Sequence, residues 1–365
     1  MSTMPPPPAD IDVQPAPEDT PAPTAPARSG WWARVARWCG VFLLIAIVLG
    51  WWWTRPQPPP SDVARRLRVE SNFRSNAMFS INGEHLAVGS GTGAVDFWRT
   101  RDWTPSFAAP LTQQPITCLA TTPDGHLLAG TLGERAIVWK WKSLEARMIS
   151  PLPEIPTSMA AHPTKTQIAV GLKNGKIWRL DTSDGVSSMV DAGHVGAVTG
   201  LAFGADGAWL ASTGADGTVR VRWDGPEKKS IVKTEHAASA AGLAVSGERA
   251  LTVDWHGEIR LWNTRDWSVL RRDSVTGGKE PDAKAADGRA RSEDSGSQVA
   301  LTDKIAAVGT FAGRVLLLSP ATGERIREIA CGYPVQALAL SPDSRHLVTA
   351  GPEAFVDVRE MSEPK

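Results

Sequence analysis

Apolar and polar residues in the larger, C-terminal part of the chain repeat with a period of roughly forty residues. A pattern of small residues, a turn and an alternating apolar and polar run recurs seven times, at Thr92, Gly133, Asn174, Asp216, His256, Ala312 and Glu353. The intervals between these positions are 41, 41, 42, 40, 56 and 41 residues. Glycine follows five of them, at Gly93, Gly175, Gly217, Gly257 and Gly313. A two-residue hairpin turn needs positive φ at its centre, so we expect a hairpin at each position.

A strand that begins about fifteen residues before the marked position is apolar on both of its faces in most units. In the fourth unit, for example, Leu201, Ala202 and Phe203 are consecutive apolar residues. A strand that is apolar on both faces is covered on both faces, so each small sheet lies between two others. Four short strands in roughly forty residues, doubly covered, describe the blade of a β-propeller. The pattern predicts an all-β fold with seven blades.

The fourth unit carries the most specific motif. The stretch "GHVGAVTGLAFGADGAWLASTGADGTVRVRWD", Gly193 to Asp224, resembles the WD-repeat propeller family, and the resemblance extends over roughly residues 66–361. In that family a His, a Ser or Thr, an Asp and a Trp form a buried hydrogen-bonded set that stiffens each blade. His194, Ser212 and Asp216 match the set, whereas Trp223 stands one position late. The resemblance therefore implies an incomplete set, or a bulge, in this blade.

The fifth unit offers a second version of the same set, with a histidine in the place of the acid. Its members are His236, Thr252, His256 and Trp262. The other units keep the pattern only as turns and apolar columns. Packing alone can hold blades of this kind.

Two features of the repeat region predict how the ring is completed. The seventh unit has no fourth strand of its own, because only a few polar residues follow Phe355–Glu360. The segment "LRVESNF", Leu67–Phe73, is left over before the first unit, and we expect it to pair with the segment around Phe355–Arg359 and close the ring. The longest interval locates a charged insertion at 273–297, expected to be a mobile, solvated loop, with a regulatory or partner-binding role as the alternative.

The N-terminal residues have a different composition. Residues 1–30 are rich in proline and poor in large apolar residues, which predicts a disordered tail. Residues 31–54 predict one transmembrane helix, with an uncharged core at 38–53 between clusters of tryptophan. A proline-rich linker, 55–65, follows. A cleaved signal peptide or a buried core helix are the alternatives for the apolar segment.

The arginines beside this segment predict its orientation. Arg28, Arg34 and Arg37 precede it closely, whereas Arg55 is alone in the ten residues after it. Positive charge stays in the cytoplasm, so the tail is expected there and the propeller on the other side of a plasma membrane. Richness in Ala, Arg and Trp, with one Tyr, favours a bacterial inner membrane. A propeller that faces the cytoplasm is the alternative.

Composition and motifs argue against catalysis and nucleic-acid binding. Equal numbers of acidic and basic residues, 39 of each, provide no surplus of positive charge for phosphate. The three cysteines and seven histidines show no metal-ligand spacing, and no nucleophile motif occurs. We therefore expect a non-enzymatic protein without a cofactor or a metal.

The hairpin tips of the seven blades are expected to converge on one face around a channel. Arg135, Lys173, Trp255 and Phe311 on these tips are the candidate binding residues. The predicted function is a membrane-anchored platform for protein-protein interaction. The alternative is a propeller hydrolase or lactonase with a metal in the channel, and converging carboxylates at the channel mouth would favour it.

Overall fold

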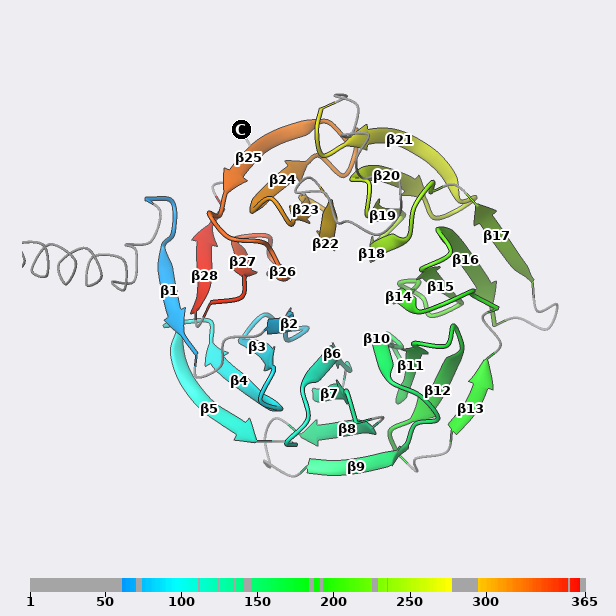
Figure 1. The fold of residues 1–365 in the computed structure, drawn as a ribbon, viewed down its shortest axis with the longest axis horizontal. Coiled ribbons are helices and arrows are strands. Elements are labelled where there is room, and N and C mark those ends of the chain that lie inside the picture. Colours follow the sequence, from blue (N-terminus) through cyan, green and yellow to red (C-terminus); the bar gives the residue numbers. More distant parts are fainter. Residues whose placement is uncertain are drawn as a thin grey trace, which may run out of the picture. The chain divides into compact units, whose positions relative to one another are not determined.

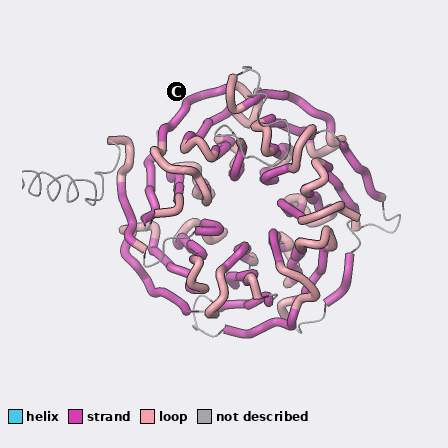
Figure 2. Tube along the Cα trace, in the orientation of Figure 1, coloured by secondary structure: helices cyan, strands magenta, loops and turns pink. Residues whose placement is uncertain are grey.

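Seven four-stranded antiparallel sheets stand around a central axis in the computed structural model (Figure 1). The structure describes residues 61–69, 74–110, 112–123, 125–133, 135–140, 146–183, 187–190, 193–224, 229–234, 236–277, 295–353 and 355–361. Figure 2 shows these residues as strands joined by loops. The predicted all-β, seven-bladed propeller is confirmed.

Each blade contains four strands in order from the axis outward. Blade one contains β2 (Arg74–Phe79), β3 (His85–Ser90), β4 (Ala94–Arg99) and β5 (Thr104–Pro110). Blade two contains β6 (Ile116–Thr121), β7 (His126–Thr131), β8 (Arg135–Lys140) and β9 (Ala146–Pro151). Blade three contains β10 (Pro156–Ala161), β11 (Gln167–Leu172), β12 (Ile177–Asp181) and β13 (Ser187–Val190). Blade four contains β14 (Val198–Phe203), β15 (Trp209–Gly214), β16 (Thr218–Trp223) and β17 (Ser230–Thr234).

The remaining three blades follow the same plan. Blade five contains β18 (Ala240–Ser246), β19 (Arg249–Asp254), β20 (Glu258–Asn263) and β21 (Ser268–Ser274). Blade six contains β22 (Gly296–Leu301), β23 (Ala306–Thr310), β24 (Arg314–Leu318) and β25 (Arg325–Ala330). Blade seven contains β26 (Ala337–Leu340), β27 (His346–Ala350), β28 (Phe355–Glu360) and β1 (Arg65–Arg68).

The N-terminal predictions fall outside this region. The tail, the apolar segment 31–54 and residues 55–60 of the linker lie outside the described residues. Within the described part of the chain, no helix has the length and hydropathy needed to cross a bilayer. The predicted linker is shorter at its C-terminal end than expected, because Arg65 already belongs to β1.

Each position that marks the repeat lies in the turn between the second and third strands of a blade. The five glycines expected to have positive φ have it, with values between 71° at Gly217 and 86° at Gly93. At Gly175 a side chain is excluded for a second reason, because a Cβ atom there would collide with the carbonyl oxygen of His194. Turn chemistry therefore sets the register of the repeat.

The core is distributed between blades. One hydrophobic cluster lies at each of the seven junctions between successive blades. At the junction of blades four and five, Trp267 packs edge-on against Trp209, with ring centroids 5.3 Å apart, and lies 6.3 Å from Trp262. Because each sheet is covered by the next one, no blade buries its apolar faces alone.

The predicted insertion is shorter than expected. β21 continues through Asp273 to Ser274, and β22 begins at Gly296, so both ends of the range 273–297 belong to strands. Asp273 also binds the guanidinium group of Arg325 in β25 of the next blade. Residues 278–294 lie outside the described residues.

The N-terminal strand closes the ring, as predicted. In Figure 1 the blue β1 lies beside the red β28, and Leu67 pairs with Val356 in an antiparallel register. The strand begins two residues earlier than expected, at Arg65, and the structure describes no residues of the predicted strand beyond Val69. Leu67 and Val69 are buried in the cluster between blades seven and one.

A buried polar network reinforces this closure. The fully buried carboxylate of Asp357 accepts two hydrogen bonds from Arg66 of β1, at 2.7 and 3.0 Å, and one of 3.0 Å from the hydroxyl of Tyr333. The equally buried Arg359 donates to Asp62 at 3.0 Å and to Thr349 at 2.7 Å. One charged contact thus joins β1 to β28, and a second joins β28 to the turn before β1.

Removing the charge at Asp357 is expected to destabilise the whole ring. The substitution Asp357→Asn keeps the size of the side chain but removes the buried negative charge that Arg66 contacts, and a broken buried pair costs about 3 kcal/mol. Chemical denaturation should show a lower free energy of unfolding by about that amount. Arg65→Ala, on an exposed position of the same strand, is the matched control and should change stability by less than about 0.5 kcal/mol. Equal stability of the two variants would contradict a role for the network in closure.

Candidate functional site

A cavity of about 740 Å³ opens at one mouth of the central channel. We call it the mouth cavity. The loops that precede the innermost strands, the first residues of those strands and the turns after the second strands supply its lining. Five blades contribute, with the residues Pro115, Ile116, Thr117, Leu132, Ile155, Pro156, Thr157, Lys173, Ala197, Ser297, Gln298, Phe311, Val335 and Gln336. Such a concave, mostly apolar site shared by several elements is typical of ligand binding.

The polar groups of the mouth cavity are few and distinctive. Lys173 is exposed, and its ammonium group has no ion-pair partner among the described residues. Ser297 Oγ and Gln336 Oε1 are buried, and neither atom has a hydrogen-bond partner within the described part of the chain. None of the described lining residues is Asp or Glu. The site therefore offers one positive charge and unused hydrogen-bonding capacity within an apolar wall.

Two of the four predicted binding residues line this cavity. Lys173 follows β11 and Phe311 follows β23, so their turns face the channel mouth from blades three and six. Arg135 opens β8 and is exposed, and Trp255, 37% exposed, lies in the β19–β20 turn, but neither belongs to the lining. The lining residues Ile155 and Val335 were not predicted, because they lie in loops without periodicity, and Leu132 was not singled out although it occupies the same turn position as Lys173 and Phe311.

The hydrogen-bonded set of blade four is closed around His194. Its Nε2 atom lies 2.8 Å from the hydroxyl of Ser212, and its Nδ1 atom lies 3.0 Å from Asp216 Oδ1. Thr218 completes the set, with its hydroxyl 3.0 Å from Nδ1. Trp223 is not a member of it, and Lys229 lies over its ring instead. The set joins the loop before β14 to the strands β15 and β16.

The environment of this set lowers two pKa values. Burial alone would raise the pKa of Asp216, but hydrogen bonds from the Val195 amide, His194 and Thr218 outweigh it and lower the pKa to about 2. Burial lowers the pKa of His194 from its ordinary value, against the opposing effect of Asp216. At neutral pH the set therefore contains a neutral imidazole and a carboxylate.

In blade five the acid that faces His236 is Asp254, with its Oδ2 atom 3.5 Å from His236 Nδ1, which corrects the prediction that His256 takes the place of the acid. His236 Nε2 lies 2.7 Å from the hydroxyl of Thr252, and Trp262 donates its indole N–H to the same hydroxyl at 2.9 Å. His256 lies in the turn, where its backbone amide donates to Asp254 Oδ1. A carboxylate two residues earlier can take this role because the end of β19 faces the His236 ring.

Blade seven contains a version of the set that was not predicted. Tyr333 stands where blades four and five have histidine, and its hydroxyl lies 2.8 Å from Thr349 Oγ1. Arg359 replaces tryptophan and donates to the same hydroxyl. Burial, followed by the charge of Asp357, raises the pKa of Tyr333, so the hydroxyl stays protonated and donates to that carboxylate. Tyrosine and arginine thus bind the threonine hydroxyl of blade seven as histidine and tryptophan bind that of blade five.

The comparison with known protein families agrees with this geometry. The family model described as "WD domain, G-beta repeat" matches residues 185–224. The matched residues include β13 of blade three and the first three strands of blade four, so this sequence repeat spans two adjacent blades. The fold is therefore a seven-bladed β-propeller, and the chain contains a WD repeat.

Individual relatives are similar over part of their length. Periodic tryptophan protein 2 of Arabidopsis thaliana is 24% identical over 212 residues, which are 55% of this chain and 23% of that protein. The target of rapamycin complex subunit wat1 of Schizosaccharomyces pombe is 26% identical over 147 residues, 39% of this chain and 46% of the relative. The chain thus spans from about a quarter to about half of these curated relatives.

Solved structures show the same fold over most of the chain. The crystal structure of the RRP9 WD40 repeats has a TM-score of 0.71 and 18% sequence identity, and the match covers 84% of this chain and 99% of that one. The structure of U3-55K has a TM-score of 0.69 at 17% identity, with 83% of this chain covered and 100% of the other. At this identity the likeness extends to the fold alone.

Acidification is expected to weaken the propeller in two steps that the set of blade four defines. Because the folded-state pKa of His194 is lowered, the unfolded chain takes up a proton first as pH falls below 6.5, and stability declines. Asp216 stabilises the fold above pH 3.8, and this contribution is lost as pH falls toward about 2. Denaturant midpoints measured from pH 7 downward should decline less steeply near pH 6 in His194→Gln than in the wild type. Identical slopes would contradict this assignment.

Proposed function

We propose that this chain is a non-enzymatic platform for protein-protein interaction and that the mouth cavity is its binding site. The observation that carries the proposal is a concave apolar site built by five blades, with an exposed lysine at its wall. The name of one relative, the target of rapamycin complex subunit wat1, supports it. The absence of carboxylates from the described lining residues gives the propeller hydrolase no support at this mouth.

The occupant that fits the mouth cavity best is an extended peptide segment with an apolar side chain and an acidic group. The apolar side chain would pack on Phe311, Ile155 and Val335. The acidic group would pair with Lys173, whose charge is not neutralised by the described residues. Peptide amide and carbonyl groups would meet the hydrogen-bonding atoms of Ser297 and Gln336 that have no described partner.

Substitutions in the mouth cavity should weaken peptide binding, whereas substitutions at hairpin tips outside the cavity should not. A library of random linear peptides selected against the full chain should yield sequences that combine large apolar and acidic residues. Phe311→Ala and Lys173→Glu should each weaken the selected peptides by at least about tenfold, since a buried aromatic anchor is worth about 2 kcal/mol. Affinity is measured by fluorescence anisotropy.

The matched control is the double variant with Arg135→Ala and Trp255→Ala, which alters two tips outside the cavity. It should bind the selected peptides within about twofold of the wild type. Peptides that lose affinity in this control but not in Phe311→Ala would place the site elsewhere on the tips. If the library yields no peptide whose affinity depends on Phe311 or Lys173, the peptide proposal is overturned.

We also propose that residues 31–54 anchor the propeller to a plasma membrane, with the tail in the cytoplasm. The uncharged segment 38–53 between tryptophan clusters supports the anchor, and the excess of arginine before it supports the orientation. Composition supports a bacterial inner membrane. The proposal implies that the mouth cavity meets its partners outside the cytoplasm.

Fusion of alkaline phosphatase after Lys365 tests this topology. The enzyme needs disulfides that form on the oxidising side of the membrane. We expect an active fusion after Lys365 and an inactive one after Arg28. The reverse pattern would establish a propeller that faces the cytoplasm. Loss of an N-terminal epitope tag from the mature protein would instead identify a cleaved signal peptide.

A further inference from the structure

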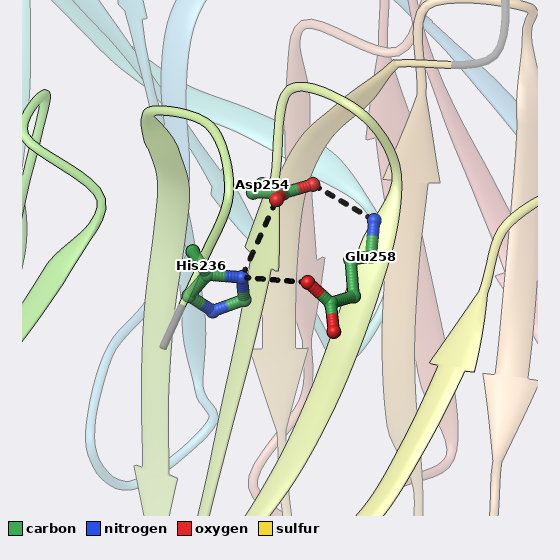
Figure 3. Close-up of side chains that lie close together, drawn as sticks. All are labelled: His236, Asp254 and Glu258. Atoms are coloured by element: carbon green, nitrogen blue, oxygen red, sulfur yellow. Dashed lines mark hydrogen bonds and ion pairs between the residues drawn. The ribbon is translucent and has the colours of Figure 1, made fainter. Parts of the chain in front are cut away.

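Blade five brings together three side chains whose types bind metal ions. His236 precedes β18, while Asp254 and Glu258 lie on either side of the β19–β20 turn (Figure 3). His236 Nδ1 lies 3.5 Å from Asp254 Oδ2 and 3.9 Å from Glu258 Oε2. The three ligand atoms all lie within 4.8 Å of one another. The sequence separates them by 18 and 4 residues, so the fold creates the cluster.

The corresponding positions of blade four show what is unusual here. Forty residues earlier, Thr218 occupies the position of Glu258, and His194 Nδ1 has two hydrogen-bonding oxygens at 3.0 Å. In blade five the imidazole faces two carboxylates across a wider gap. His236 and Asp254 have fully buried side chains, and Nδ1 and Oδ2 have no hydrogen-bond partner in the described part of the chain. Buried polar atoms in this state are costly, and a cation between them would satisfy both.

Both carboxylates are held in place by hydrogen bonds from neighbouring groups. Asp254 Oδ1 accepts the backbone amides of His256 at 3.0 Å and Glu258 at 2.8 Å. Arg260 donates to both oxygens of Glu258, at 2.8 and 2.9 Å. Neighbouring groups thus orient both carboxylates, and Glu258 Oε2 faces His236 while it also accepts a hydrogen bond from Arg260, as outer hydrogen bonds orient the ligands in metal sites.

From this geometry we propose that His236, Asp254 and Glu258 bind one divalent transition-metal ion, and that Zn²⁺ fits the site best. One imidazole nitrogen and two carboxylate oxygens suit Zn²⁺, at about 2.1 Å from each ligand, with water in the fourth position. Ligands around such an ion lie about 3.4 Å apart, so the carboxylate of Glu258 needs a small inward shift. This side chain is 28% exposed and can make that shift.

The charges and hydrogen bonds around the site are compatible with this ion. Two carboxylates and the guanidinium group of Arg260 leave one net negative charge beside the imidazole of His236. When Nδ1 binds the metal, Nε2 carries the proton and donates it in a hydrogen bond to Thr252, whose hydroxyl oxygen has lone pairs for both His236 and Trp262. The ion would tie the turn that carries Trp255 to the loop before β18.

Titration of the full chain in detergent with ZnCl₂, after treatment with EDTA, tests the site. Isothermal titration calorimetry should show one ion per chain. Asp254→Asn and Glu258→Gln should each raise the dissociation constant by at least about tenfold. Co²⁺ in place of Zn²⁺ should give the visible spectrum of a tetrahedral site, and this spectrum should be absent from both variants.

The matched control is Asp216→Asn in blade four, which removes the carboxylate beside the other histidine and should leave Zn²⁺ affinity within about twofold. Circular dichroism establishes whether each variant folds. Because Glu258 is partly exposed, Glu258→Gln decides the question if Asp254→Asn does not fold. No saturable binding by the wild type, or equal affinity in the wild type and Glu258→Gln, would overturn the proposal.

Discussion

The antiparallel pairing of β1 with β28 is the interaction on which the ring depends. A propeller buries apolar area only between adjacent blades, so every junction contributes to stability. An open junction exposes the apolar faces of two blades to water together. At this junction the strand pairing, the burial of Leu67 and the ion pair of Asp357 all stabilise the contact between β1 and blade seven. Arg66 and Asp357 are 291 residues apart in sequence, yet they are in direct contact. Closure therefore converts seven small sheets into one cooperative unit.

Much of this architecture could be predicted because it follows from local rules. Positive φ at glycines such as Gly93 and Gly217 fixes the hairpins, and apolar residues on both faces of a strand reveal that the strand is covered twice. The set of blade seven was missed for an equally physical reason. A tyrosine hydroxyl and an arginine N–H can make the connections that histidine and tryptophan make elsewhere, but a search for residue types does not find them.

The candidate sites were less predictable than the fold. Lys173 and Phe311 were identified from their places in the hairpin tips, but the cavity that they share also needs loops before the inner strands, and these loops have no pattern. The cluster in blade five escaped for another reason. His236 lies 18 residues before Asp254, a spacing that matches no linear metal motif, and only the register of the strands brings the two side chains together. A site whose residues come from different strands can be recognised only in the three-dimensional structure.

The distance in sequence between the two closing strands also determines when the ring can form during synthesis. β1 leaves the ribosome well before its partner β28. At typical translation rates the separation of 291 residues corresponds to a delay on the order of tens of seconds. During that interval β1 has unsatisfied backbone groups along its edge, and this nascent strand is where mispairing with another chain would begin.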